Sequence, residues 1–302
     1  MLKRIFLFVL INVLILITIG FFIQICGIDT AFAEDDIHYA DLLVFSTIVG
    51  FTGALISLAF SKQIAKASVG AVVIKDPDSQ KEAFVLRTVE FLAEQAGVNV
   101  PEVAVYKGAP NAFATGPTKN NALIAVSTGL MELMPPEQLK AVLAHEMSHV
   151  VNGDMVTMTL LQGVLNTFVV FAARVLASFL NRGKKRSSHW EYYSCVRLAE
   201  VVLGLFATLL LYAFSRKREY RADAGAAGLT GNPDAMIGAL KTLSSGKIQP
   251  LPPATRAFGI MDSESFVALF STHPPIKDRI SALSALRDGT TGRGGVFGDL
   301  AE

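Results

Sequence analysis

Cysteine is scarce in this 302-residue chain, which contains only Cys26 and Cys195. So few thiols exclude a cysteine-rich zinc site and give little basis for a disulfide framework. An excess of either charge is also missing, because the formal net charge is +1, so the composition gives no reason to expect a nucleic-acid partner. Instead, 51% of the residues are hydrophobic and the mean hydropathy is +0.44. This composition excludes an ordinary soluble enzyme and leaves room for one catalytic domain besides membrane spans.

Histidine is scarce too, yet two of the five histidines stand four positions apart in the H-E-M-S-H stretch at 145–149. Pro135 and Pro136 suit the start of a helix that contains this stretch. On a helix, His145 and His149 share one face and can bind a single Zn²⁺, with Glu146 placed to act as general base on a water molecule. The alternative is an amphipathic helix with two polar histidines.

A hydrolytic zinc site usually has three protein ligands, so another donor must come from elsewhere in the chain. We expect it to be Glu219, in the charged segment at 215–223. Asp223 lies one helical turn further on and is predicted to accept the N–H of a ligand histidine, His145 in our interpretation, which fixes the imidazole tautomer. The alternative is a solvated helix with intrahelical ion pairs, such as Glu219 with Arg216.

Four motifs in order carry a family resemblance: Asn111-Ala112-Phe113-Ala114-Thr115-Gly116, H-E-M-S-H at 145–149, E-Y-R-A-D at 219–223, and Ser271-Thr272-His273-Pro274-Pro275. With them, nearly the whole chain resembles the bacterial HtpX membrane metallopeptidases, gluzincins related to the prenyl-protein (CAAX) endopeptidases. The resemblance implies one Zn²⁺ per subunit, bound by His145, His149 and Glu219, with Glu146 as general base.

The resemblance also implies that the strand at Asn111–Thr115, including Asn111, Ala112 and Phe113, is the sheet edge that binds a substrate peptide. A purely structural hairpin strand is the alternative. His273 is expected either to hydrogen-bond the developing oxyanion or simply to precede a helix. The implied substrates are proteins or peptides, above all misfolded membrane proteins cut on the cytoplasmic side in quality control and stress response.

Four hydrophobic segments are long enough to be considered as membrane spans: Ile5–Ile23, Leu42–Phe60, Met155–Leu180 and Tyr192–Phe214. A cleaved signal peptide is the alternative for the first, because Lys3 and Arg4 precede it and Ala31-Phe32-Ala33 resembles a cleavage site. The positive-inside rule places the N-terminus and the chain after Phe60 in the cytoplasm of a plasma or inner membrane protein, which we expect to have both termini there.

The last two segments must either both cross the bilayer or both fail to cross, because His149 and Glu219 on their two sides must meet at one ion. Crossing is favoured by the uncharged run at 155–173, although it places the basic residues of the 182–186 loop outside, against the positive-inside rule. The alternative is a partly embedded hairpin.

The expected fold is an α-helical integral membrane protein with an α+β zincin-like (gluzincin) catalytic domain, four hydrophobic segments and a small mixed or antiparallel sheet. Its strands are predicted at Glu102–Tyr106, Asn111–Thr115 and Leu123–Ser127. The expected domains are 1–60, two transmembrane helices with a short acidic external loop; 61–154, the first part of the catalytic domain; 155–214, two further hydrophobic segments; and 215–302, the rest of the catalytic domain with a mobile tail.

The sequence thus predicts a zinc-dependent endopeptidase at the cytoplasmic membrane surface. An intramembrane-cleaving metalloprotease would place H-E-x-x-H within a long apolar span, whereas Glu137, Lys140 and Asp154 flank this helix. A non-enzymatic, zinc-stabilised membrane scaffold or transporter is the other alternative, but no internal repeat supports it.

Overall fold

The computed structural model describes residues 39–181, 189–245 and 273–289. Internal contacts divide the chain into two compact units. The first, which we call the helical unit, is formed by residues 1–59 and 157–211. The second, which we call the sheet-containing unit, is formed by residues 60–156 and 212–302.

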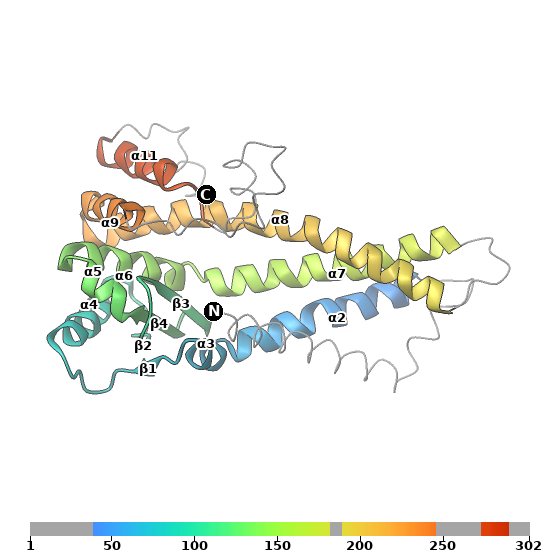
Figure 1. The fold of residues 1–302 in the computed structure, drawn as a ribbon, viewed down its shortest axis with the longest axis horizontal. Coiled ribbons are helices and arrows are strands. Elements are labelled where there is room, and N and C mark those ends of the chain that lie inside the picture. Colours follow the sequence, from blue (N-terminus) through green and yellow to red (C-terminus); the bar gives the residue numbers. More distant parts are fainter. Residues whose placement is uncertain (1–38, 182–188, 246–272, 290–302) are drawn as a thin grey trace. The chain divides into compact units, whose positions relative to one another are not determined.

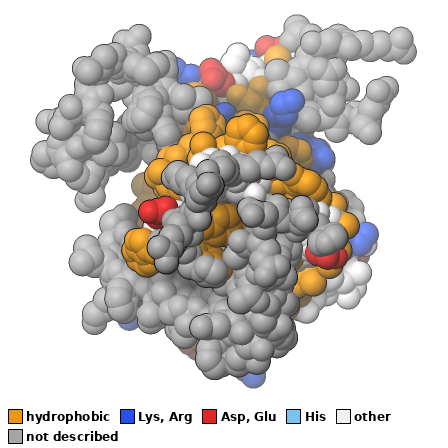
Figure 2. Space-filling model, turned by 90° about the vertical axis from the view of Figure 1, so that its right-hand side faces the viewer, with side chains coloured by type: hydrophobic (Ala, Val, Ile, Leu, Met, Phe, Trp, Pro, Cys, Tyr) orange, Lys and Arg blue, Asp and Glu red, His pale blue; other side chains and the backbone are white. Residues whose placement is uncertain are grey.

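Three long helices supply the described part of the helical unit (Figure 1): α2 (Tyr39–Ala59), most of α7 (Asp154–Asn181) and the first half of α8 (His189–Thr230). Residues 154–156 of α7 and 212–230 of α8 belong to the sheet-containing unit. All three are long and apolar enough to cross a bilayer. The predicted segments at 42–60, 155–180 and 192–214 each fall on one of them, while the segment at 5–23 and the basic loop at 182–186 lie outside the described residues. On the face that Figure 2 draws, the side chains of the described residues are mainly hydrophobic.

Small residues let the helices of this unit pack closely. A Cβ atom added at Gly50 of α2 would lie 2.5 Å from the backbone nitrogen of Thr167 on α7, and one added at Gly163 of α7 would lie 2.5 Å from the Phe51 ring. Between α7 and α8, a guanidinium nitrogen of Arg174 lies 3.1 Å from the carboxylate of Glu200. Backbone proximity and one ion pair therefore add to the apolar contacts within this unit.

The sheet-containing unit holds a mixed four-stranded sheet with the order β1-β2-β4-β3. Its strands are β1 (Val72–Val73), β2 (Glu102–Tyr106), β3 (Ala112–Thr118) and β4 (Asn121–Ser127). Strands β2 and β4 are parallel, and the other two pairings are antiparallel. The three predicted strands correspond to β2, β3 and β4, while β1 was not expected. The mostly helical fold with a small mixed sheet is thus confirmed.

Strand β3 lies at one edge of the sheet, and its pairing decides which backbone groups face outward. The Ser127 N–H donates to the Asn111 carbonyl over 2.9 Å, so the antiparallel alternation leaves the N–H and C=O groups of Ala112 and Ala114 pointing away from β4. The regular register ends after Thr115. Gly116 has φ +153°, and a Cβ there would overlap the Asn121 carbonyl, so this bulge requires glycine.

The helices that lie wholly within this unit are, in chain order, α3 (Ser61–Val69), α4 (Gln80–Ala96), α5 (Thr128–Leu133), α6 (Pro136–Val151), α9 (Pro233–Ser245) and α11 (Ile276–Arg287). The hydroxyl of Ser79 caps α4 by accepting the Glu82 N–H over 3.2 Å. The main core joins α4, α6 and the sheet through buried residues that include Val89, Leu92, Ile124, Leu143 and Met147.

Helices α6 and α8 approach each other closely where Gly225 of α8 faces Ser148 of α6. A Cβ added at Gly225 would lie 2.5 Å from the Ser148 hydroxyl oxygen, and that serine is itself buried. Ala222 and Ala226, on the same part of α8, are completely buried. Small side chains therefore set the distance between these two helices.

A Gly225→Val change should push α8 away from α6 and destabilise the protein by about 1–3 kcal/mol, the usual cost of overpacking. Gly228→Val on the same helix is the matched control, because a Cβ there has no neighbour within 4 Å. Thermal melting in detergent should show a lower Tm for the Gly225 variant only. The Gly228 variant should not melt earlier, because valine has a higher helix propensity than glycine. Equal melting of both variants would contradict this role of Gly225.

Candidate metal centre

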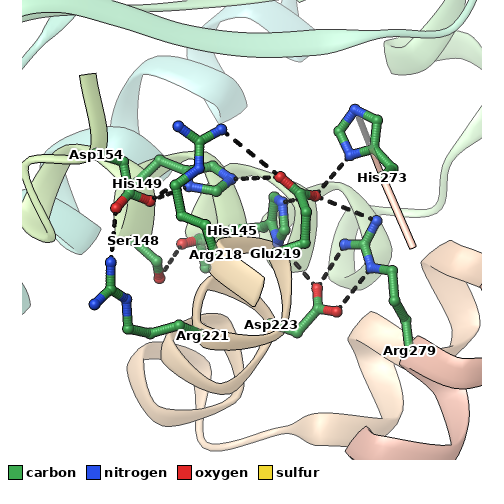
Figure 3. Close-up of polar contacts among 11 residues, drawn as sticks. His145, Ser148, His149, Asp154, Arg218, Glu219, Arg221, Asp223, His273 and Arg279 are labelled. Carbon is green, nitrogen blue, oxygen red and sulfur yellow. Dashed lines mark hydrogen bonds and ion pairs between the residues drawn. The ribbon is translucent and has the colours of Figure 1, made fainter. Parts of the chain in front are cut away.

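One turn of α6 presents two buried imidazoles, and α8 brings a carboxylate to both (Figure 3). The Nε2 atom of His145 lies 3.5 Å from one oxygen of Glu219, and the Nε2 atom of His149 lies 3.4 Å from the other. The Glu219 side chain is only 1% exposed. The structure therefore brings together the three residues that the sequence suggested as ligands.

This set of donors fits a metal ion. Two imidazole nitrogens and one carboxylate oxygen lie within 4.8 Å of one another, and all three residues are buried. The separations of 3.4 and 3.5 Å are too long for strong hydrogen bonds, yet each Nε2 points at the carboxylate. Among the described residues, this is the group of three such side chains that could hold an ion.

Each histidine turns its other ring nitrogen to a second carboxylate. The Nδ1 atom of His145 lies 3.0 Å from Asp223, the residue expected in this place. The Nδ1 atom of His149 lies 2.6 Å from Asp154, a contact that the sequence did not suggest. In the sequence Asp154 is one of the charges that flank the helix, and its position five residues after His149 is the signal that could have indicated this contact.

Arginine side chains accompany these carboxylates. Arg279 of α11 donates two hydrogen bonds to Asp223, over 2.8 and 2.6 Å, and lies 3.6 Å from Glu219. Arg221 donates to Asp154 over 2.9 Å. Sequence reasoning missed both arginines, because Arg279 belongs to no motif and Arg221 lies in a segment that also fits a solvated charged helix. The negative charge around the histidines is thus balanced within the protein.

The carboxylates also determine the protonation of the metal-free histidines. Burial disfavours the charged imidazolium, but Asp223 and Glu219 outweigh burial and raise the pKa of His145 to about 9. Burial opposes the charged form of His149 as well, yet Asp154 and Glu219 raise its pKa. Any metal must therefore displace protons from this site near neutral pH, so that metal binding releases protons.

The remaining candidate residues lie on the same unit. Glu146 of α6 is partly exposed, unlike the two histidines beside it. His273 is 63% exposed in its side chain, and its Nδ1 atom lies 2.7 Å from Glu219. Ala112 and Phe113 lie on β3, with Asn111 immediately before it, and β3 packs beside α6.

Comparisons with known proteins agree with this geometry. The profile of peptidase family M48 matches residues 79–287. The chain belongs to peptidase family M48 and is a metalloendopeptidase. It is 48% identical to a Protease HtpX homolog of Janthinobacterium sp. (strain Marseille), over 94% of this chain and 100% of that protein. It is also 49% identical to one of Herminiimonas arsenicoxydans, with the same coverage.

A solved structure shares the fold. The crystal structure of S. mikatae Ste24p matches 94% of this chain and 67% of that chain, with a TM-score of 0.63 and 19% sequence identity. Together with the three apolar helices, these relatives make the chain a membrane metalloprotease. The expected resemblance to the HtpX metallopeptidases is confirmed.

Replacing Arg279 by methionine should destabilise the protein by about 3–5 kcal/mol, because Asp223 would remain buried with its carboxylate uncompensated. Arg287→Met on the same helix is the control, since its ion pairs with Asp234 and Asp288 are solvent-exposed. Thermal melting should show a large loss for the first change and a small one for the second. Equal Tm values for both variants would count against a supporting role for Arg279.

Proposed function

We propose that this chain is a zinc-dependent endopeptidase that hydrolyses peptide bonds of membrane or misfolded proteins at the cytoplasmic membrane surface. The observation that carries the proposal is the separation of the donor atoms. Two tetrahedral ligands, each 2.0–2.1 Å from zinc, would lie about 3.3 Å apart. One Glu219 oxygen lies 3.5 Å from His145 Nε2 and the other lies 3.4 Å from His149 Nε2, which supports one Zn²⁺ per subunit in a gluzincin-type site.

The proposed chemistry divides between the ion and the side chains. Zinc, when bound, supplies Lewis acidity that makes a water molecule reactive near neutral pH and polarises the peptide carbonyl. Glu146, partly exposed beside the ligands, accepts the proton of the attacking water and delivers it to the leaving nitrogen. His273 is proposed to hydrogen-bond the developing oxyanion, because its ring is exposed and can be reached by a substrate.

We propose that the substrate peptide pairs with the edge of β3 at 111–115. Ala112 and Ala114 offer their N–H and C=O groups on this edge, and β3 packs beside the helix of the metal ligands. Phe113 points its backbone groups to β4 instead and packs its ring among the buried residues of the sheet. Backbone pairing selects extended chains with little regard to their side chains, which suits misfolded proteins as substrates.

We further propose that the domains are arranged as the sequence suggests, with two amino-terminal spans, a catalytic domain split between residues 61–154 and 215–302, and two spans between its halves. Among the described residues, the candidate spans are α2, α7 and α8, and α6 with its histidines is not one of them. This favours hydrolysis outside the hydrocarbon over intramembrane cleavage. A role in membrane-protein quality control and stress response would follow from such a position.

A Glu146→Gln change should lower turnover by about 10²–10⁴-fold and leave the zinc content intact, because it removes the base but no ligand. Glu219→Gln is the contrasting variant, and it should lower zinc content as well as turnover. Cleavage of an unfolded protein and metal analysis of the purified variants measure both quantities. Retained turnover in the Glu146 variant would exclude the assigned base.

Crossing of the bilayer by α7 and α8 predicts that the loop at 181–191 lies outside the cytoplasm. Reporter fusions in this loop should then be active only with a reporter that requires export. Fusions after residue 66, within the cytoplasmic segment, are the control and should give the opposite result. A cytoplasmic signal from the loop would instead support the partly embedded hairpin.

A further inference from the structure

Asp154 is a buried carboxylate that the proposed hydrolysis does not use. Its residue is 0% exposed, and both of its oxygens have partners. One oxygen lies 2.6 Å from Nδ1 of His149, and the other accepts a hydrogen bond from Arg221 over 2.9 Å. The Nε atom of Arg218 lies 3.6 Å from the first oxygen. The Asp154 carboxylate therefore contacts the His149 imidazole and is held in place by the two arginines.

We propose that Asp154 is a positioning residue for the metal site, which holds His149 in the tautomer and ring orientation that metal binding requires. An ionised carboxylate only accepts hydrogen bonds, so Nδ1 of His149 must carry the proton. In the neutral imidazole that metal binding requires, the lone pair then belongs to Nε2, the atom that points at Glu219. Contact with the carboxylate also makes the ring a stronger donor. This inference rests on the proposed metal site.

Local backbone geometry supports the assignment. Gly153, with φ +64°, lies between the end of α6 and the start of α7, and glycine readily adopts this left-handed conformation. The resulting turn carries Asp154 back to His149, only five residues earlier. Asp154 is also the first residue of α7, where free backbone N–H groups favour a negative charge. The carboxylate is therefore placed by the backbone as well as by the arginines.

Asp154 complements Asp223, which stands 3.0 Å from Nδ1 of His145. Asp223 lies on α8 together with Glu219, whereas Asp154 lies on α7. Each ligand histidine thus has its own carboxylate, supplied by a different helix and held by its own arginine. Loss of Asp154 should therefore weaken the site through His149 alone and leave the three ligands in the chain.

The test is the zinc affinity of the full-length protein in detergent, measured by competition with a chromophoric chelator. Asp154→Ala should weaken zinc binding by about 10–100-fold. Asp154→Asn keeps an acceptor oxygen without the charge and should fall between the alanine variant and the unaltered protein. Asp234→Ala is the matched control, because Asp234 is also a first-turn aspartate, on α9, but pairs with the exposed Arg287 and touches no ligand.

Unchanged affinity in Asp154→Ala, or an equal loss in Asp234→Ala, would overturn the inference. Should the alanine variant fail to fold, as judged by circular dichroism, Asp154→Asn decides. Weaker zinc binding and an altered visible spectrum of its Co²⁺ form would support the role, whereas unchanged affinity and spectrum would refute it. If the unaltered protein binds no zinc, the proposed function itself fails, so the two failures are distinguishable.

Discussion

The close packing of α8 against α6 is the constraint on which the metal centre depends. One helical turn sets the spacing of His145 and His149, but Glu219 reaches them only because another helix lies near. Gly225 opposite Ser148 permits that approach. Packed helices usually lie about 8–10 Å apart, depending on the side chains between them, so residues of small volume determine whether Glu219 reaches the two histidines. Catalytic geometry is thereby tied to packing two turns away from the carboxylate.

The many buried charges around the two histidines compensate one another. Glu219, Asp223 and Asp154 are all buried, and unpaired carboxylates in such surroundings would oppose folding. Arg279 and Arg221 compensate Asp223 and Asp154 with hydrogen bonds of 2.6–2.9 Å, and Arg279 also lies 3.6 Å from Glu219. Helix α8 carries both carboxylates and guanidinium groups within two turns, so this one helix supplies much of the negative charge of the site and much of the positive charge that balances it. The candidate metal site and the fold around it are consequently stabilised by the same contacts.

Periodicity predicted the parts of the site that lie within single elements. The i, i+4 spacing on α6 and α8 identified the histidine pair, Glu219 and Asp223, and strand-like composition located β2 and β4. Contacts across a turn or between distant helices leave no such pattern, so Asp154 and Arg279 were missed. Strand β1 has only two residues, too few to alternate. The apolar run ended at Phe214, yet α8 continues to Thr230, because arginine, lysine and glutamate also favour helix.

The bulge at Gly116 limits the length of the regularly paired part of the edge strand β3. Pairing is regular only from Ala112 to Thr115, so the substrate chain proposed to bind here would meet about four outward backbone groups. Once such a chain is severed, its two fragments divide these few bonds between them and each is held less firmly than the intact polypeptide. Such weak binding of the fragments would favour product release and limit product inhibition.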